Sequence, residues 1–197
     1  MMNGNSIQGM RVAALATDGF ELTEYTEPRK ALEQAGATVV LIAPKAGTIY
    51  AMKHHDKAGT FTVEMTLDKA DPASFEAVLL PGGANNADAL RMMPAAQEFV
   101  RRAQHANKPI AVICHGAWLL VSAGLVKGRR MTSWPSIADD IRNAGGLWED
   151  REVIRDRNWI SSRKPDDLPA FNREMITLFG EARRGQPVQP TGSVSAR

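Results

Sequence analysis

The chain has 197 residues, of which 44% are hydrophobic and 23% charged, and its formal net charge at pH 7 is +2. This length suffices for one well-buried domain, and the small net charge argues against a nucleic-acid or membrane-surface partner. No stretch is apolar enough for a membrane span, the first ten residues lack a signal-peptide core, and the single cysteine excludes an internal disulfide framework. We therefore expect a cytoplasmic protein.

Short apolar runs alternate with segments of helical periodicity along the chain. The predicted strands are 10–16, 38–43, 77–80 and 110–113. The predicted helices are 21–35, 94–106, 136–144 and 166–180, with a further helix that ends near residue 123. Polar segments predict hairpins at 48–63 and 153–161. Pro28 should bend or break the first helix, because proline lacks the backbone N–H that a helix uses.

This alternation predicts an α/β fold with a mostly parallel sheet and helices on both faces. We expect a flexible N-terminus over 1–9, a single domain over 10–180 and a flexible tail over 181–197, which is poor in bulky apolar residues. In such sheets the ligand crevice lies at the carboxyl ends of the strands. The segments that should converge there are 18–21, 81–83 and 114–116.

Cys114 is the only cysteine, and it directly follows the strand predicted at 110–113. His115 and Gly116 come next, before an apolar segment at helical spacing. A strand, a tight turn and a helix N-terminus would display the thiol at the sheet edge. The helix dipole favours thiolate, so we expect Cys114 to titrate below the free-thiol pKa of ~8.5. The alternative is that Cys114 is a small buried hydrophobic residue.

A thiolate nucleophile needs a proton carrier and donors for developing negative charge. His115 could carry the proton or only frame the pocket. Glu21 is predicted to hydrogen-bond to the sulfur with a raised pKa, although an acid in the first turn of a helix needs no such role. Gly82 and Gly83 could present backbone N–H groups as an oxyanion hole, or could simply form a tight turn. Trp134 could line the pocket.

Other histidines are weaker candidates for a site. The sequence His54-His55-Asp56 could be imagined as metal ligands, but it lacks further ligand spacing and is more typical of a polar loop. We expect no metal and no organic cofactor.

The combined motifs resemble the ThiJ/PfpI superfamily, and most of all the PfpI-type intracellular cysteine peptidases. The resemblance is carried by Ile113-Cys114-His115-Gly116 and residues 119–124. Supporting stretches are 18–21, 79–83, 132–136, 139–145 and 158–163. They run in family order from about Arg11 to Phe179, which is nearly the whole chain.

The resemblance implies a flavodoxin-like three-layer sandwich with a nucleophile elbow. It implies Cys114 as the nucleophile, His115 as its partner, Glu21 as the carboxyl group at the sulfur, and the backbone N–H groups of Gly83 and His115 as oxyanion donors. It also implies a homo-oligomer, either a dimer or a hexamer, in which a neighbouring subunit supplies a third catalytic acid.

The loop expected to supply that acid follows the Pro-Gly-Gly sequence at 81–83. Asp88 is the only acid in the loop, and residues 88–91 match the acid-x-apolar-Arg pattern of the family. The alternative is that Asp88 merely caps the short segment 89–91.

Three functions use the same residues. The first is a cysteine-dependent hydrolase of the PfpI peptidase type, acting on a peptide or a small carbonyl substrate. The second is a glyoxalase III-type or deglycase stress enzyme that acts on methylglyoxal or glycated groups. The third is a redox-sensing stress protein in which the same cysteine is oxidised. The motifs do not discriminate among them.

Overall fold

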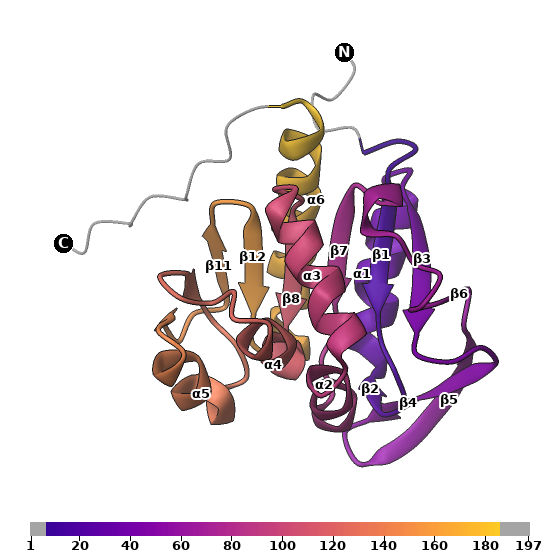
Figure 1. The fold of residues 1–197 in the computed structure, drawn as a ribbon, viewed down its shortest axis with the longest axis horizontal. Helices are drawn as coiled ribbons and strands as arrows, with labels where there is room; N and C mark the ends of the chain where they lie inside the picture. Colours follow the sequence, from indigo (N-terminus) through magenta and orange to yellow (C-terminus); the bar gives the residue numbers. More distant parts are fainter. Residues whose placement is uncertain (1–6, 186–197) are drawn as a thin grey trace.

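The structure, a computed structural model, describes residues 7–185 (Figure 1). Its main sheet has seven strands in the order β11-β12-β8-β7-β1-β3-β6, and all neighbouring pairs are parallel except β11 with β12. The strands are β1 (Arg11–Leu15), β3 (Thr38–Ala43), β6 (Met65–Thr66), β7 (Ala77–Leu80), β8 (Ile110–Ile113), β11 (Val153–Asp156) and β12 (Trp159–Ser162).

Two smaller sheets flank the main one. The first contains β2 (Phe20–Glu21), β4 (Thr48–Lys53) and β5 (Asp56–Thr62), and the second contains β9 (Arg130–Met131) and β10 (Leu147–Trp148). The helices are α1 (Leu22–Gln34), α2 (Ala84–Arg91), α3 (Pro94–His105), α4 (Ala117–Ser122), α5 (Ala138–Asn143) and α6 (Leu168–Arg183). Short 3-10 turns lie at Pro72–Ser74, Cys114–Gly116, Pro135–Ile137 and Pro165–Asp167.

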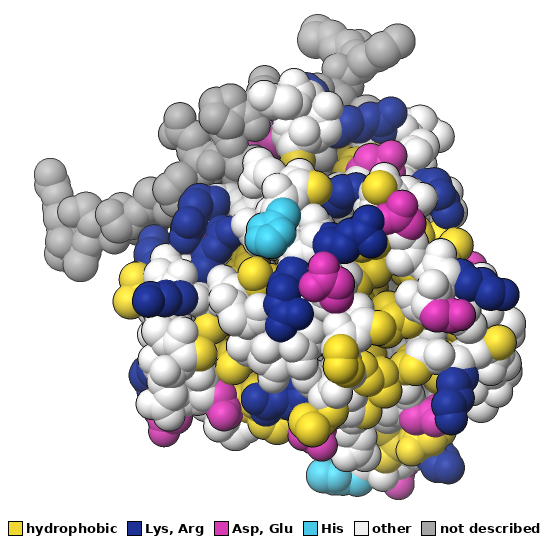
Figure 2. Space-filling model, in the orientation of Figure 1, with side chains coloured by type: hydrophobic (Ala, Val, Ile, Leu, Met, Phe, Trp, Pro, Cys, Tyr) yellow, Lys and Arg dark blue, Asp and Glu magenta, His cyan; other side chains and the backbone are white. Residues whose placement is uncertain are grey.

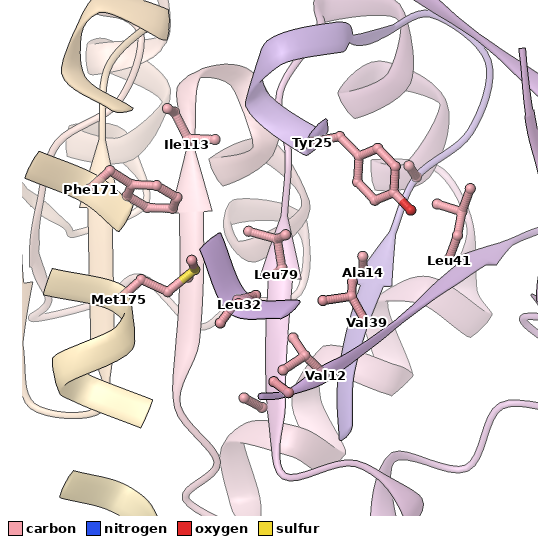
Figure 3. Packing of buried hydrophobic residues seen from close by; sticks show 14 of the residues in the cluster. Val12, Ala14, Tyr25, Leu32, Val39, Leu41, Leu79, Ile113, Phe171 and Met175 are labelled. Carbon is pink, nitrogen blue, oxygen red and sulfur yellow. The ribbon is translucent and has the colours of Figure 1, made fainter. Parts of the chain in front are cut away.

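The central strands β7 and β8 are buried along their whole length, which explains their continuous apolar runs. Successive residues of β1 point to opposite faces of the sheet. Val12 and Ala14 pack with residues of α1 and α6, such as Leu32 and Phe171 (Figure 3). Ala13 and other residues on the second face pack with α3 and α4. The predicted three-layer, flavodoxin-like α/β sandwich is therefore confirmed.

The surface carries charges of both signs. Figure 2 shows Lys and Arg side chains interspersed with Asp and Glu side chains on one face, in keeping with the small net charge of +2. Within residues 7–185, no helix has the length and apolar character needed to cross a bilayer.

The structure adds the short strands β2, β6, β9 and β10, which were not predicted, and it differs from the sequence predictions at other places too. Helix α1 continues through Pro28, so the predicted break does not occur, and the alternative of a bend stays a prediction. Segment 84–91, expected to be a loop, forms helix α2. At the N-terminal boundary, Ile7 is fully buried in the core, although 1–9 was predicted to be flexible. At the other boundary, residues 181–183 belong to α6, so the final helix is longer than predicted. Most of the predicted flexible ends, namely 1–6 and 186–197, lies outside the described residues.

Candidate active site

A cavity of about 630 Å³ lies at the carboxyl ends of the parallel strands. The segments predicted to converge there do so, because Gly19 and Glu21, Gly83, and Cys114 with His115 all line it. The remaining lining residues are Glu24, Met52, His54, His55, Ala84, Asn85, Trp134 and Pro165. The turn between β4 and β5 and the segments that contain Trp134 and Pro165 therefore complete the walls.

Cys114 occupies a sharp turn between β8 and α4. Its φ angle is +60°, a left-handed conformation that is uncommon for residues other than glycine. A non-glycine residue in this region costs on the order of 1–3 kcal/mol, so the surrounding packing must hold it there. The side chain is 7% exposed, and the backbone N–H groups of His115 and Gly83 hydrogen-bond to the sulfur. The predicted elbow is present, and the two predicted N–H donors face its thiol.

The carboxyl group at the sulfur belongs to Glu24, whereas Glu21 was predicted. Glu24 is completely buried, hydrogen-bonds to Cys114, and accepts a hydrogen bond from the Gly82 N–H at 3.0 Å through Oε2. Its Oε1 has no nitrogen or oxygen partner among the described residues. The reason for the wrong assignment is that α1 begins at Leu22, which leaves Glu21 extended in β2 and places Glu24 in the first helical turn.

Helical spacing is the signal that could have found Glu24. The buried residues Pro28 and Leu32 follow Glu24 at intervals of four. Glu21 also fits this face, because Tyr25, Pro28 and Leu32 follow it at intervals of four, three and four. The two acids can therefore be separated only by the position at which the helix starts, and sequence patterns locate helix ends poorly.

Burial controls the titration of the Glu24–Cys114 pair. It raises the pKa of Glu24 to about 8, against an opposing effect of the hydrogen bond to Cys114, and the charge of Glu21 raises it further. Burial also raises the pKa of the Cys114 thiol, and a charged Glu24 adds to this, whereas the N–H groups of His115 and Gly83 lower it. Burial of the thiol therefore acts against the predicted lowering of the Cys114 pKa.

Gly82 and Gly83 have different roles. The Gly82 N–H is engaged by Glu24, so Gly82 does not serve as the predicted oxyanion donor. A Cβ atom on Gly82 would lie 2.6 Å from the Cβ of Cys114 and would overlap Oε2 of Glu24, so only glycine fits. Gly83 has a φ of +90° and its N–H faces the sulfur, as predicted.

Asn86 holds this turn in place and was not identified from the sequence. It is fully buried, donates to the carbonyl groups of Pro81 and Gly82 at 3.2 and 3.0 Å, and accepts from the Thr17 N–H at 2.7 Å. A polar residue two positions after a Gly-Gly pair carries no pattern that distinguishes burial from exposure.

His115 lies within reach of the thiol. Its Nδ1 is 3.2 Å from Sγ of Cys114, and desolvation lowers the pKa of the ring, so the imidazole is neutral near pH 7. The ring of Trp134 stacks on it with centroids 6.1 Å apart, and Trp118 contacts it edge-on at 5.2 Å. Trp118 is in turn held by a hydrogen bond from Nε1 to Asp140 at 3.2 Å and by Arg91 over its ring. Trp134 lines the cavity as predicted, with 38% of its surface exposed.

Asp88 is exposed in the middle of helix α2. It therefore does not cap the segment 89–91, which excludes that alternative. Among the described residues, no carboxylate hydrogen-bonds to His115, so the histidine has no acid partner from its own chain. His54 and His55 lie in the turn between β4 and β5 at the cavity. Within residues 7–185, no group of three His, Cys, Asp or Glu side chains is placed to hold a metal ion.

These features define an α/β domain that displays one cysteine at a sharp strand-to-helix turn, beside a buried carboxyl group and a histidine. The DJ-1/PfpI family matches residues 10–178, and the chain belongs to this family.

Individual relatives cover most of the chain. Protein/nucleic acid deglycase 2 of Escherichia coli is 40% identical over 171 residues, which span 86% of this chain and 98% of the relative. YraA of Bacillus subtilis, whose name gives cysteine protease as a proposed activity, is 40% identical over 169 residues with the same coverage. A crystal structure of a two-domain protein with DJ-1/ThiJ/PfpI-like and ferritin-like domains, from Anabaena variabilis, is 29% identical with a TM-score of 0.81 and covers 95% of this chain and 52% of that one.

Proposed function

We propose that the chain is a cysteine-dependent hydrolase that acts as a deglycase on adducts of methylglyoxal with amines or thiols. The observation that carries this proposal is the neutral His115 imidazole, whose Nδ1 lies 3.2 Å from the buried thiol of Cys114. A neutral imidazole can accept a proton, and the deglycation of such adducts requires one group that moves protons between neighbouring atoms. The name of the Escherichia coli relative supports the same activity.

The proposed reaction begins on an adduct R–X–CH(OH)–CO–CH3, where X is the nitrogen or sulfur of the modified group. Sγ of Cys114 forms a bond to the hydroxyl-bearing carbon while the bond from that carbon to X breaks. His115 takes the thiol proton and delivers it to X, which leaves as R–XH. Since the pKa of the thiol is raised, the thiolate forms as the proton moves to His115.

Two further steps complete the reaction. His115 moves the proton of the sulfur-bound carbon to the adjacent carbonyl carbon, and the hydroxyl proton of the first carbon moves to the carbonyl oxygen of the second. The first carbon is thereby oxidised to a thioester and the second is reduced to an alcohol. Water then cleaves the thioester, releasing lactate and restoring the thiol. The backbone N–H groups of Gly83 and His115 face the sulfur and stabilise negative charge on the substrate oxygen. No external oxidant is needed, because the reaction is an internal redox exchange plus one water.

Peptide hydrolysis is the second candidate. It requires an acid from a neighbouring subunit beside His115, because no carboxylate of the described residues contacts this histidine. A peptidase needs a protonated histidine to donate to the leaving amine. An acid from a neighbouring subunit would raise the pKa of His115, and we propose Asp88 for this role because it is exposed on α2. This proposal requires a homo-oligomer. A cytoplasmic location would provide the reducing conditions that a free thiol needs.

Oxidation of Cys114 is the third candidate. The protonated carboxyl group of Glu24 beside the sulfur could donate a hydrogen bond to a sulfinate, which suits a redox-sensing protein. This use of the site requires peroxide but no substrate turnover.

One set of measurements tests these proposals. The purified protein is incubated with the methylglyoxal adduct of N-acetylcysteine, with an unstructured protein, or with peroxide, and Cys114 is followed by mass spectrometry. A deglycase forms lactate faster than the adduct dissociates spontaneously, as measured with a dicarbonyl trap. Lactate formation no faster than that dissociation rules out direct action on the adduct. Peptide cleavage without lactate selects the peptidase, and a sulfinate without turnover selects the redox sensor.

A further inference from the structure

Glu21 lines the cavity without contributing to the sulfur site. Its carboxylate accepts a hydrogen bond from the backbone N–H of His54 at 3.1 Å. Among residues 7–185, no Lys, Arg or His side chain forms an ion pair with it. It occupies the N-cap position of α1 but makes no capping hydrogen bond with its side chain. Helix capping and ion pairing therefore do not account for this carboxylate.

The backbone of Glu21 is held on two sides. Glu21 pairs with Met52 in the small sheet, and its N–H donates to the carbonyl oxygen of Gly82 at 3.3 Å. His54, which supplies the third contact, has a φ of +58° that turns the chain so that its N–H meets the carboxylate. The backbone of Glu21 is consequently held in place, and the hydrogen bond from His54 orients its carboxylate before any substrate binds, which favours a selective contact.

The cavity contains no opposing fixed charge. No lysine or arginine is among the described residues that line it. The other ionisable lining residues are Glu24, Cys114, His54, His55 and His115. Glu24 has a pKa of about 8 and the Cys114 thiol has a raised pKa, so neither is substantially charged at neutral pH. Glu21 is close enough that its charge raises the pKa of Glu24, which places it within electrostatic range of the reacting atoms.

We propose that Glu21 is a specificity-determining residue that selects adducts in which the modified group still carries a positive charge, as a guanidinium or a quaternary ammonium group does. This inference rests on the proposed deglycase function, and it names the class of substrate that the cavity accepts. An anionic group would meet the carboxylate with no compensating cation. A neutral group would be accepted with intermediate efficiency.

The test uses three methylglyoxal hemithioacetals whose remote group is cationic, neutral or anionic. The thiols are thiocholine (cationic), 2-mercaptoethanol (neutral) and 3-mercaptopropionate (anionic), none of which carries an amine that could close a ring. The dissociation constant and spontaneous dissociation rate of each adduct are measured first, so that kcat/KM refers to the adduct itself. All assays use one buffer at a single neutral pH, so that the protonation of the cavity is the same for the three adducts.

We expect kcat/KM to fall from the cationic to the anionic adduct by about tenfold, with most of the change in KM. Added salt should reduce the ratio, because the cavity is open to solvent ions. Glu21→Gln should make the three kcat/KM values more alike, because kcat/KM should fall for the cationic adduct and rise for the anionic one. Glu27→Gln makes the same chemical change on an exposed residue of α1 and should keep the wild-type ranking.

The outcomes separate this inference from the function on which it rests. Equal kcat/KM for the three adducts in the wild-type protein overturns the role of Glu21 and leaves deglycase activity standing. A Glu21→Gln protein that loses the same factor on all three adducts also overturns it, because the side chain would then be only structural. Failure of the wild-type protein to process any adduct faster than it dissociates overturns the proposed function and the inference together.

Discussion

The two ends of strand β8 bury polar groups in opposite ways. At its amino end, the Asn158 side chain donates to Gln104 and to the Lys108 carbonyl and accepts from Arg129 at 3.0 Å, so its hydrogen-bonding groups are engaged. At its carboxyl end, Cys114 has an unfavourable backbone conformation, and Glu24 is buried with one oxygen, Oε1, that has no hydrogen-bond partner among the described residues. The amino end of β8 therefore contributes to stability, whereas the carboxyl end retains groups that can react.

The largest expected effect is the loss of the nucleophile. Cys114→Ser should reduce lactate formation to the uncatalysed rate, because a hydroxyl is a far weaker nucleophile than a thiol at this pH. The melting temperature should stay close to the wild-type value, since the change in volume is small. Turnover and circular dichroism on the same preparation check this. Wild-type rates in Cys114→Ser would show that catalysis does not proceed through a covalent bond to Cys114.

A large effect is also expected at Asp88, which bears on whether the catalytic site at the carboxyl end of β8 is complete within one chain. If Asp88 orients His115 of a neighbouring subunit, Asp88→Ala should lower kcat strongly with little change in melting temperature. A mixture of Cys114→Ser and Asp88→Ala subunits should regain activity, because mixed interfaces can combine an intact cysteine with an intact acid. Sedimentation and complementation assays measure this. A monomer in solution, or a mixture that stays inactive, would leave the site within one chain.

Glu24 should make stability depend on pH. The folded protein keeps the Glu24 proton up to a pKa of about 8, whereas the unfolded chain releases it near the ordinary value of 4.5. The folded state therefore binds more protons between these values, and the free energy of unfolding falls as pH rises, by at most ~1.4 kcal/mol per pH unit. This contribution is complete below about pH 4.5 and lost above about pH 8.

Denaturant titrations across this pH range check the slope. Glu24→Gln should flatten it, and the exposed substitution Glu27→Gln should leave it unchanged. The Glu24→Gln protein should also form different Cys114 oxidation products with peroxide. An identical pH slope in wild-type and Glu24→Gln proteins would contradict the raised pKa.

The amino end of β8 should respond to mutation through stability alone. Asn158→Ala leaves the buried Arg129 and Gln104 groups with fewer partners and should cost about 2–4 kcal/mol of unfolding free energy. The kcat of the folded fraction should be unchanged. Asn143→Ala, at an exposed position of α5, is the matched control and should be nearly neutral. A loss of kcat in Asn158→Ala would show that the two ends are coupled.

The smallest effect is expected at Trp118, which contacts His115 from the side. Trp118→Phe keeps an aromatic ring but loses the hydrogen bond to Asp140, so the imidazole should be less well oriented. We expect kcat to fall about threefold to tenfold with little change in KM. Trp148→Phe loses a comparable bond, to Ser133 at 3.0 Å, and should leave kcat unchanged. Equal kinetics in the two variants would mean that Trp118 does not position His115.

Elements whose formation depends mainly on one physical force lie where the sequence predicted them. Strands β3, β7 and β8 lie at the predicted residues because apolar runs between glycine, proline and polar residues leave little choice of register. Helix α2 was missed because Ala84-Asn85-Asn86-Ala87 has no clear apolar stripe, and its helicity comes from packing on neighbouring helices. Pro28 did not end α1, because packing of its buried ring compensates for the lost backbone hydrogen bond.

The part of the site that lies in tight turns at strand ends was predicted correctly. Cys114, His115 and Gly83 are fixed by the turns in which they lie, so their convergence followed from the topology. The choice between Glu21 and Glu24 depended on one helix boundary, and the titration of Cys114 depended on burial that a sequence does not report. Asn86 and Trp118 take their roles from residues distant in the chain, so no local pattern identifies them.

The absence of a side chain at Gly82 restricts how this enzyme could be engineered or could diverge. Any larger residue there would meet Cys114 and Glu24 together, so a substitution would disturb the proposed nucleophile and the buried carboxyl group beside it in one step. Variation of substrate range can instead arise at other lining positions of the cavity, such as Glu21, Met52, His55 and Trp134, whose side chains can change size or charge. A library confined to these four positions should yield altered selectivity at nearly constant stability, whereas a library at Gly82 should yield inactive or unfolded protein.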